Sequence, residues 1–109
     1  MTDVRVVLVT VPPGDLATGL ANSLVGERLA ACVNVIPGLR SIYRWEGQVC
    51  DESESLLVIN TVQDRLDQLV ARVRQLHPYA LPEVLVLPVD AGSIPYMDWV
   101  LAETRPFLP

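Results

Sequence analysis

The sequence predicts a compact α+β domain with the element order βαββαβ, followed by one more helix. Three observations support this fold class. A β-branched run covers Val4–Val11, two later segments carry apolar residues at helical spacing, and two long extended segments meet at Glu46-Gly47. The 109 residues are 50% hydrophobic, enough to bury a core without disulfides or a structural metal. We therefore expect one domain over residues 1–109.

The first strand and helix follow from local signals. The run Val4–Val11 stops at Pro12-Pro13-Gly14, which predicts a central strand covered on both faces. Asp15 is expected to cap the next helix. The apolar residues of that helix recur every three or four positions, as in an amphipathic helix; they are Leu16, Ala17, Leu20, Ala21, Leu24 and Val25.

A long β-hairpin is predicted next. Cys32–Ile36 is extended, Pro37-Gly38 interrupts it as a bulge, and Leu39–Trp45 continues the same arm. Glu46-Gly47 forms a two-residue turn in which glycine supplies the positive φ of a primed turn. The return arm is expected to run from Gln48 to Thr61.

The second half repeats the architecture of the first. Thr61 with Asp64 resembles a capping box, and the helix after it carries the apolar stripe Leu66, Leu69, Val70, Val73 and Leu76. His77-Pro78 ends this helix, Val84–Leu87 is a fourth strand, and Ile94-Pro95 opens the last helix. The order predicts a ferredoxin-like fold, with both main helices on one face of a four-stranded sheet.

The hairpin is too long for the domain that carries it. Each arm has about 14 residues and spans roughly 46 Å, whereas a domain of ~100 residues has a radius of gyration of about 13 Å. The tip must project or bend away, and its apolar residues, among them Tyr43 and Trp45, need a cover. Only 19% of the chain is charged, less than usual. We expect a homo-oligomer.

Charge and cysteine content exclude several classes of function. The net charge is −5, lysine is absent, and the eight arginines are dispersed, so no basic patch for nucleic acid is predicted. The first apolar run is too short for a signal sequence or a membrane span. We therefore expect a cytoplasmic protein with no membrane partner. Cys32 and Cys50 are expected to be free thiols, with Cys32 buried as a small hydrophobe.

Chemistry-bearing residues are few. The only histidine, His77, is either a favourable cation at a helix C-terminus or a ligand of a metal or small molecule. One histidine and two separated cysteines cannot close a four-ligand site within a subunit, so a tight site would form between subunits or use carboxylates. Asp51, Glu52 and Glu54 are either such carboxylates or a solvated cluster. Without a phosphate-binding or dinucleotide motif, we expect no enzyme and no required cofactor.

Five strings occur in register along the chain: Thr10-Val11-Pro12, Leu29-Ala30-Ala31-Cys32-Val33-Asn34, Ser41-Ile42-Tyr43-Arg44-Trp45-Glu46-Gly47, His77-Pro78-Tyr79 with Pro82-Glu83, and Tyr96-Met97-Asp98-Trp99. Together they resemble the CutA divalent-cation tolerance family from Val4 to Ala102. The resemblance implies a trimer similar in architecture to the PII signalling proteins, with interlocking hairpins. It also implies a link to tolerance of divalent metals, especially copper.

Position by position, the resemblance implies a ligand-binding cleft between subunits, lined by Cys32, Tyr43, Trp45, His77, Tyr79 and Trp99. Two departures weaken copper binding, because Val9 and Leu76 stand where copper-binding members can carry a cysteine and a second histidine. His77 is the one metal ligand that carries over, so copper affinity is expected to be weak. Asn60 replaces a usual lysine, which alters the charge of the cleft.

We therefore expect a non-enzymatic cytoplasmic homotrimer that binds a divalent metal or a small ligand in its clefts. The alternative is a PII-like signalling adaptor that senses a small anion. A third hypothesis is a purely structural trimer.

Overall fold

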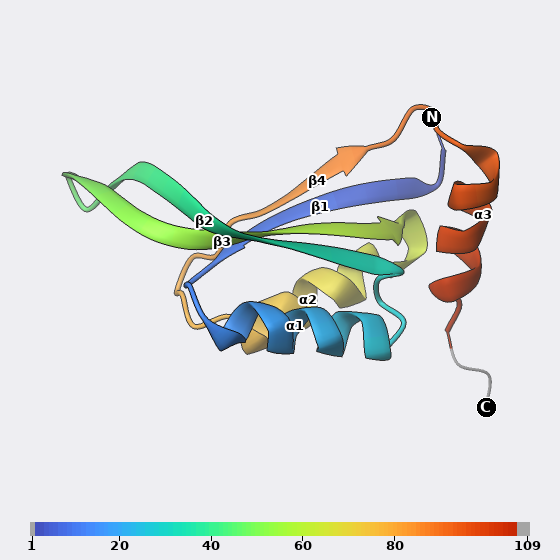
Figure 1. Cartoon of the computed structure of the whole chain (residues 1–109), viewed down its shortest axis with the longest axis horizontal. Helices are drawn as coiled ribbons and strands as arrows, with labels where there is room; N and C mark the ends of the chain where they lie inside the picture. The colour runs from blue at the N-terminus through green and yellow to red at the C-terminus, as the bar shows by residue number, and fades with distance from the viewer. Residues whose placement is uncertain (1, 107–109) are drawn as a thin grey trace.

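The computed structural model describes residues 2–106 and has the predicted order of elements (Figure 1). A 3-10 turn, Gln63–Arg65, joins the second half to the first. The strands and helices are β1 (Val4–Val11), α1 (Asp15–Gly26), β2 (Cys32–Trp45), β3 (Gln48–Val62), α2 (Leu66–Leu76), β4 (Val84–Pro88) and α3 (Ile94–Glu103).

The four strands form one sheet in the order β2-β3-β1-β4, with every neighbouring pair antiparallel. Figure 1 shows α1 and α2 together on one face of this sheet and α3 at the end opposite the hairpin tip. This is the predicted ferredoxin-like fold. The core lies between the sheet and the two helices and contains, among others, Val7, Val9, Leu57, Ile59, Leu20, Leu24, Leu69 and Val73.

The long hairpin is confirmed. Its arms have 14 and 15 residues, and its tip extends well beyond α1 and α2 (Figure 1), in a molecule whose longest dimension is 45 Å. Glu46 (φ 49°) and Gly47 (φ 78°) both have positive φ, as a primed two-residue turn requires. The register between β2 and β3 shifts between Ile36 and Leu39, which confirms the bulge at Pro37-Gly38.

Both predicted helix caps are wrong. Gly14, with φ 108°, occupies the cap position of α1, because the turn after the two prolines requires a backbone conformation that glycine adopts easily. Asp15 is instead the first helical residue, where its charge still favours the helix N-terminus. Thr61 lies inside β3, fully buried, and its hydroxyl donates to the Leu29 carbonyl at 2.7 Å.

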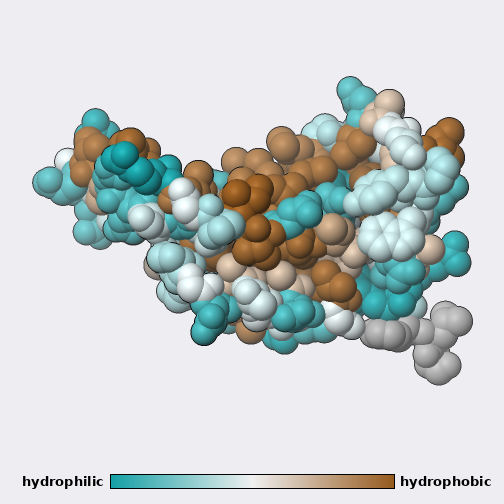
Figure 2. Space-filling model, in the orientation of Figure 1, coloured by the Kyte–Doolittle hydropathy of each residue, from teal (hydrophilic) through white to brown (hydrophobic). Residues whose placement is uncertain are grey.

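The second face of the sheet is covered by a helix only at one end, where Val100 of α3 packs against Val4 and Val62. Leu8 of β1 lies between Val58 and Leu85, and Val6 lies beside Leu87. We call these five residues the open sheet face. Leu85 is 54% exposed and Leu87 45%, and hydrophobic residues gather over the middle of the molecule in Figure 2. The central place of β1 is confirmed, but the expectation that it is covered on both faces is wrong for a single chain.

No helix within residues 2–106 is both long and apolar enough to cross a membrane.

Candidate functional site

A pocket of about 560 Å³ lies along the outer half of the hairpin, where β2 and β3 face the segment between α2 and β4. We call it the acidic pocket. The register pairs Tyr43 with Cys50 and Ser41 with Glu52, so these side chains lie on the same face of the hairpin. The pocket is lined by Thr10, Ser41, Tyr43, Arg44, Trp45, Cys50, Glu52, Glu54, Tyr79, Ala80, Leu81 and Glu83.

Two phenols face two carboxylates in this pocket. The Tyr79 hydroxyl donates to Glu54 Oε2 at 3.2 Å, and Glu54 is only 5% exposed. Burial, together with the neighbouring Glu54 charge, raises the pKa of Tyr79. Burial and then the interaction with Glu52 raise the pKa of Tyr43 to about 12. Both phenols therefore stay protonated at neutral pH and can donate hydrogen bonds.

His77 supports the pocket wall from behind. The ring is buried, and its Nε2 lies 2.7 Å from the Thr10 carbonyl oxygen. Since a carbonyl only accepts, Nε2 carries the proton, and Nδ1 accepts the Tyr79 backbone N–H at 3.2 Å. The two rings are 4.7 Å apart. His77 thus cross-links the Thr10 carbonyl and the Tyr79 backbone and orients Tyr79, and its metal role stays a prediction.

Cys32 and Trp99 lie at the other end of the sheet, near α3. The Asn34 amide donates to Cys32 Sγ at 3.9 Å, and the Trp99 ring is 5.6 Å from Tyr96. The Tyr96 hydroxyl donates to Oδ1 of Asn60, at 2.5 Å. Cys32 is half-buried, so the expectation that it is a buried hydrophobe is wrong. Alternation along β2 puts it on the face opposite α1 and α2, beside Asn60 at the end of that face that α3 covers.

Of the six predicted ligand residues, one chain thus brings together Tyr43, Trp45 and Tyr79, with His77 behind them. Sequence reasoning missed Cys50 and Glu83 as pocket residues. The alternation of β3 opposite Tyr43 could have indicated Cys50, whereas Glu83 lies in a segment without periodicity. Within residues 2–106, no three His, Cys, Asp or Glu side chains converge to hold a metal ion.

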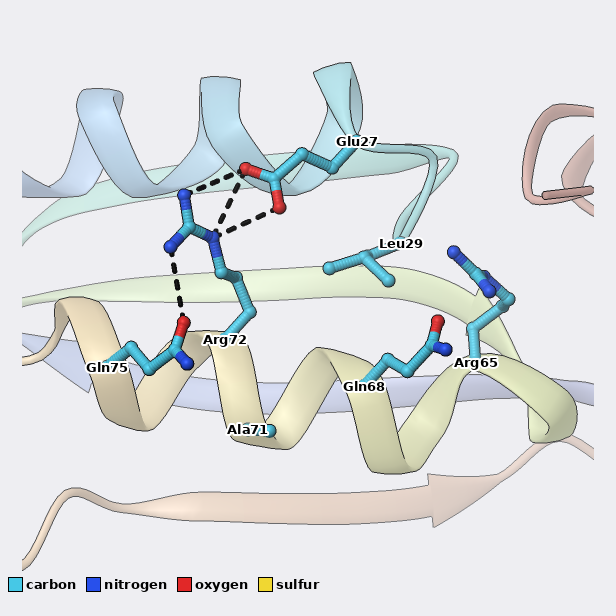
Figure 3. Close-up of a pocket in the computed structure, with 7 residues that line it drawn as sticks. All are labelled: Glu27, Leu29, Arg65, Gln68, Ala71, Arg72 and Gln75. Atoms are coloured by element: carbon cyan, nitrogen blue, oxygen red, sulfur yellow. Dashed lines mark hydrogen bonds and ion pairs between the residues drawn. The ribbon is translucent and has the colours of Figure 1, made fainter. Parts of the chain in front are cut away.

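A second pocket of about 370 Å³ lies between the end of α1 and the face of α2 (Figure 3). The guanidinium of Arg72 contacts both oxygens of Glu27 at 3.0–3.2 Å and also donates to Gln75 Oε1. Arg65 lines the opposite end of this pocket, and its Nε donates to the Arg28 carbonyl at 3.4 Å. None of the predicted ligand residues lies here.

Comparison with known sequences gives consistent matches over most of the chain. The family model described as "CutA1 divalent ion tolerance protein" matches residues 5–103. The "Divalent-cation tolerance protein CutA" of Thermus thermophilus is 48% identical over 100 residues, which are 92% of this chain and 97% of that protein. The "Protein CutA, chloroplastic" of Arabidopsis thaliana is 49% identical over 92% of this chain, but only 55% of its own length is matched.

Comparison with solved structures finds relatives of the same kind. The Thermus thermophilus divalent cation tolerance protein superposes with a TM-score of 0.91 at 47% identity, covering 94% of this chain and 99% of that one. A structure titled "PII-like protein CutA" from Nostoc superposes with a TM-score of 0.88 at 38% identity, again over 94% and 99%. The expected cytoplasmic location stays a prediction, because the Arabidopsis relative is named as chloroplastic.

Proposed function

Because the chain belongs to the CutA1 divalent ion tolerance protein family, we propose that it is a non-enzymatic cytoplasmic homotrimer that contributes to divalent metal tolerance. In this proposal it binds a divalent cation or a small ligand in clefts between its subunits. The acidic pocket forms one wall of each cleft.

The observation that carries the proposal is the position of the acidic pocket beside the open sheet face. Alternate residues along β3 share a side of the strand, so Glu52 and Glu54 lie on the same side as Val58. A second copy that covers the open sheet face therefore also approaches the mouth of the pocket. Exposed apolar faces of this kind are typical of oligomer interfaces, and the projecting hairpin offers further surface to a neighbour.

In such a cleft, two subunits together supply the predicted ligand residues that a single chain holds far apart. Tyr43, Trp45 and Tyr79 come from the acidic pocket of one copy, and Cys32 and Trp99 would come from the far end of the next. Glu52 and Cys50 offer a hard and a soft ligand for a metal. His77 is the one imidazole, but it must release the Thr10 carbonyl or the Tyr79 N–H before it can coordinate.

Calorimetric titration with copper tests the metal role. We compare the natural protein with His77→Ala and Glu52→Gln, after checking that each variant keeps the same oligomeric mass. A weaker affinity in Glu52→Gln supports the carboxylate as a ligand. Identical curves for the natural protein and His77→Ala would remove His77 from the metal role, and no copper heat from any of them would contradict metal binding.

The second candidate is a PII-like signalling adaptor that senses a small anion. Two observations favour it: the likeness to the Nostoc structure titled as PII-like, and the presence of Arg65 and Arg72 in the pocket of Figure 3. A thermal-shift screen against nucleotides and organic acids distinguishes the two candidates, because a ligand that binds only the folded state raises the melting temperature. A purely structural trimer responds to neither experiment.

A further inference from the structure

We propose that the acidic pocket binds an organic ammonium ion, with its carboxylates holding the charged nitrogen and its aromatic rings packing against the carbon chain. This inference rests on the proposed function only in that the pocket is a ligand site. It assigns the chemical class of the ligand, a primary aliphatic amine.

The charge of the pocket favours a cation. Its lining contains three carboxylates, Glu52, Glu54 and Glu83, against a single guanidinium, Arg44. Glu54 is only 5% exposed, and its hydrogen-bond partner is the neutral phenol of Tyr79. Neither of the two ion pairs found within residues 2–106 involves it. A buried carboxylate without a countercharge costs free energy, and a bound cation offsets that cost.

The spacing of the carboxylates suits an ammonium group. Glu52 and Glu54 lie two residues apart on one side of β3, so their backbone positions are roughly 7 Å apart. An ammonium has three N–H donors and forms short, charge-assisted hydrogen bonds to carboxylates. A bare divalent metal requires more convergence, since calcium takes six or more oxygens, and no three candidate ligands converge within residues 2–106.

The rings in the lining favour an organic cation over a hydrated metal. Trp45 is 45% exposed, Tyr43 38% and Tyr79 37%, and all three line the same pocket. Aromatic faces attract ammonium groups and pack against the methylenes beside them. The volume of about 560 Å³ falls in the range of small-molecule sites, so an alkyl chain also fits.

Calorimetry with putrescine, at low ionic strength, tests the inference on the whole natural protein. Butane-1,4-diol and adipate are matched probes, since they keep the same chain of methylenes and replace the ammonium groups by hydroxyls or carboxylates. We expect heat from putrescine alone. Glu52→Gln and Glu54→Gln should each weaken the affinity about tenfold or more. Glu103→Gln, an exposed carboxylate at the end of α3, removes the same charge elsewhere and should leave the affinity unchanged.

The result distinguishes this inference from the proposed function. If putrescine gives no heat, or if Glu52→Gln and Glu54→Gln bind it as tightly as the natural protein, the ammonium ligand is refuted. Copper titrated into the same samples then decides the proposed function separately. Copper heat that weakens in Glu52→Gln leaves the pocket as a metal site, whereas no heat with either probe contradicts both.

Discussion

At the scale of single residues, Thr61 joins two parts of the chain that are far apart in sequence. Its buried hydroxyl donates to the Leu29 carbonyl at 2.7 Å. We expect Thr61→Val to lower the free energy of unfolding by about 1–2 kcal/mol, because it leaves a buried carbonyl without that donor. Urea unfolding at a fixed protein concentration measures the change. Thr18→Val, at an exposed position of α1, is the control and should change stability by less than about 0.5 kcal/mol.

The tyrosines give a second prediction at this scale. Burial and Glu52 raise the pKa of Tyr43 to about 12, from an ordinary value of 10.0. Between these values the unfolded chain loses the phenol proton while the folded chain keeps it. The contribution of Tyr43 to stability is therefore complete below pH 10 and is lost as the pH rises towards 12.

Absorbance of the phenolate, followed as the pH rises, checks this prediction. Tyr43→Phe should remove a group that titrates near the top of the range, and Glu52→Gln should bring the pKa of Tyr43 closer to 10. A Tyr43 that ionises at its ordinary pKa in the folded protein would show that the phenol is neither desolvated nor held beside Glu52.

At the scale of elements, the hairpin turn holds a residue that is poorly suited to its conformation. Glu46 has φ 49°, a region that disfavours most side chains. Glu46→Asn should raise the free energy of unfolding by about 0.5–1 kcal/mol, because Asn-Gly is the preferred pair for this turn. Urea unfolding compares it with Glu46→Gln, which removes the charge without easing the backbone. Equal stability in both variants would place the effect in the charge instead.

The last helix depends on one arginine of the segment between α1 and β2. The Arg28 guanidinium donates to the carbonyls of Ala102 at 2.7 Å and Arg105 at 2.5 Å, and so caps the C-terminal end of α3. Arg28→Met should speed amide hydrogen exchange in the last turn of α3 by about fivefold or more. Arg74→Met, at an exposed position of α2, should leave exchange there unchanged. Unaltered exchange in Arg28→Met would mean that α3 is held by packing alone.

Local chemistry made the elements themselves predictable. Pro37-Gly38 and Glu46-Gly47 specify a bulge and a turn through backbone preferences of the residues present. The position of Thr61 inside β3 could not be predicted from the sequence. Its partner Leu29 is 32 residues away, and threonine is found both in strands and at helix N-termini. The burial of Cys32 was also predicted wrongly. Its apolar neighbours in the sequence indicate burial, but the side of β2 on which it lies decides its exposure.

The candidate site was predictable only in part. The resemblance identified Tyr43, Trp45 and Tyr79, which the structure brings into one pocket. The role of His77 behind the wall depends on its two hydrogen bonds, and no sequence pattern encodes these. Glu83 reaches the pocket through the course of an irregular segment, which periodicity does not describe.

At the scale of the whole molecule, the open sheet face predicts the oligomeric state. Leu85 is 54% exposed in one chain, and we expect a neighbouring subunit to cover it. Leu85→Asp should convert the expected trimer to a monomer, because a buried unpaired carboxylate opposes association. Light scattering after size exclusion measures the mass. Ala71→Asp, on the exposed side of α2, should remain trimeric, and a natural protein of monomeric mass would refute the trimer.

The central position of β1 also governs the order in which the chain can fold as it is synthesised. Both neighbours of β1 are made later, since it pairs with β3 and β4. Val11 and Pro88 are 77 residues apart, which at the usual rates of translation is roughly 4–15 s. Until β3 is complete at Val62 the first strand has both edges unpaired, a state prone to aggregation, and the edge that β4 covers stays unpaired for the whole interval. Nascent chains that end before Gln48 should therefore depend on chaperones, whereas the released protein should not.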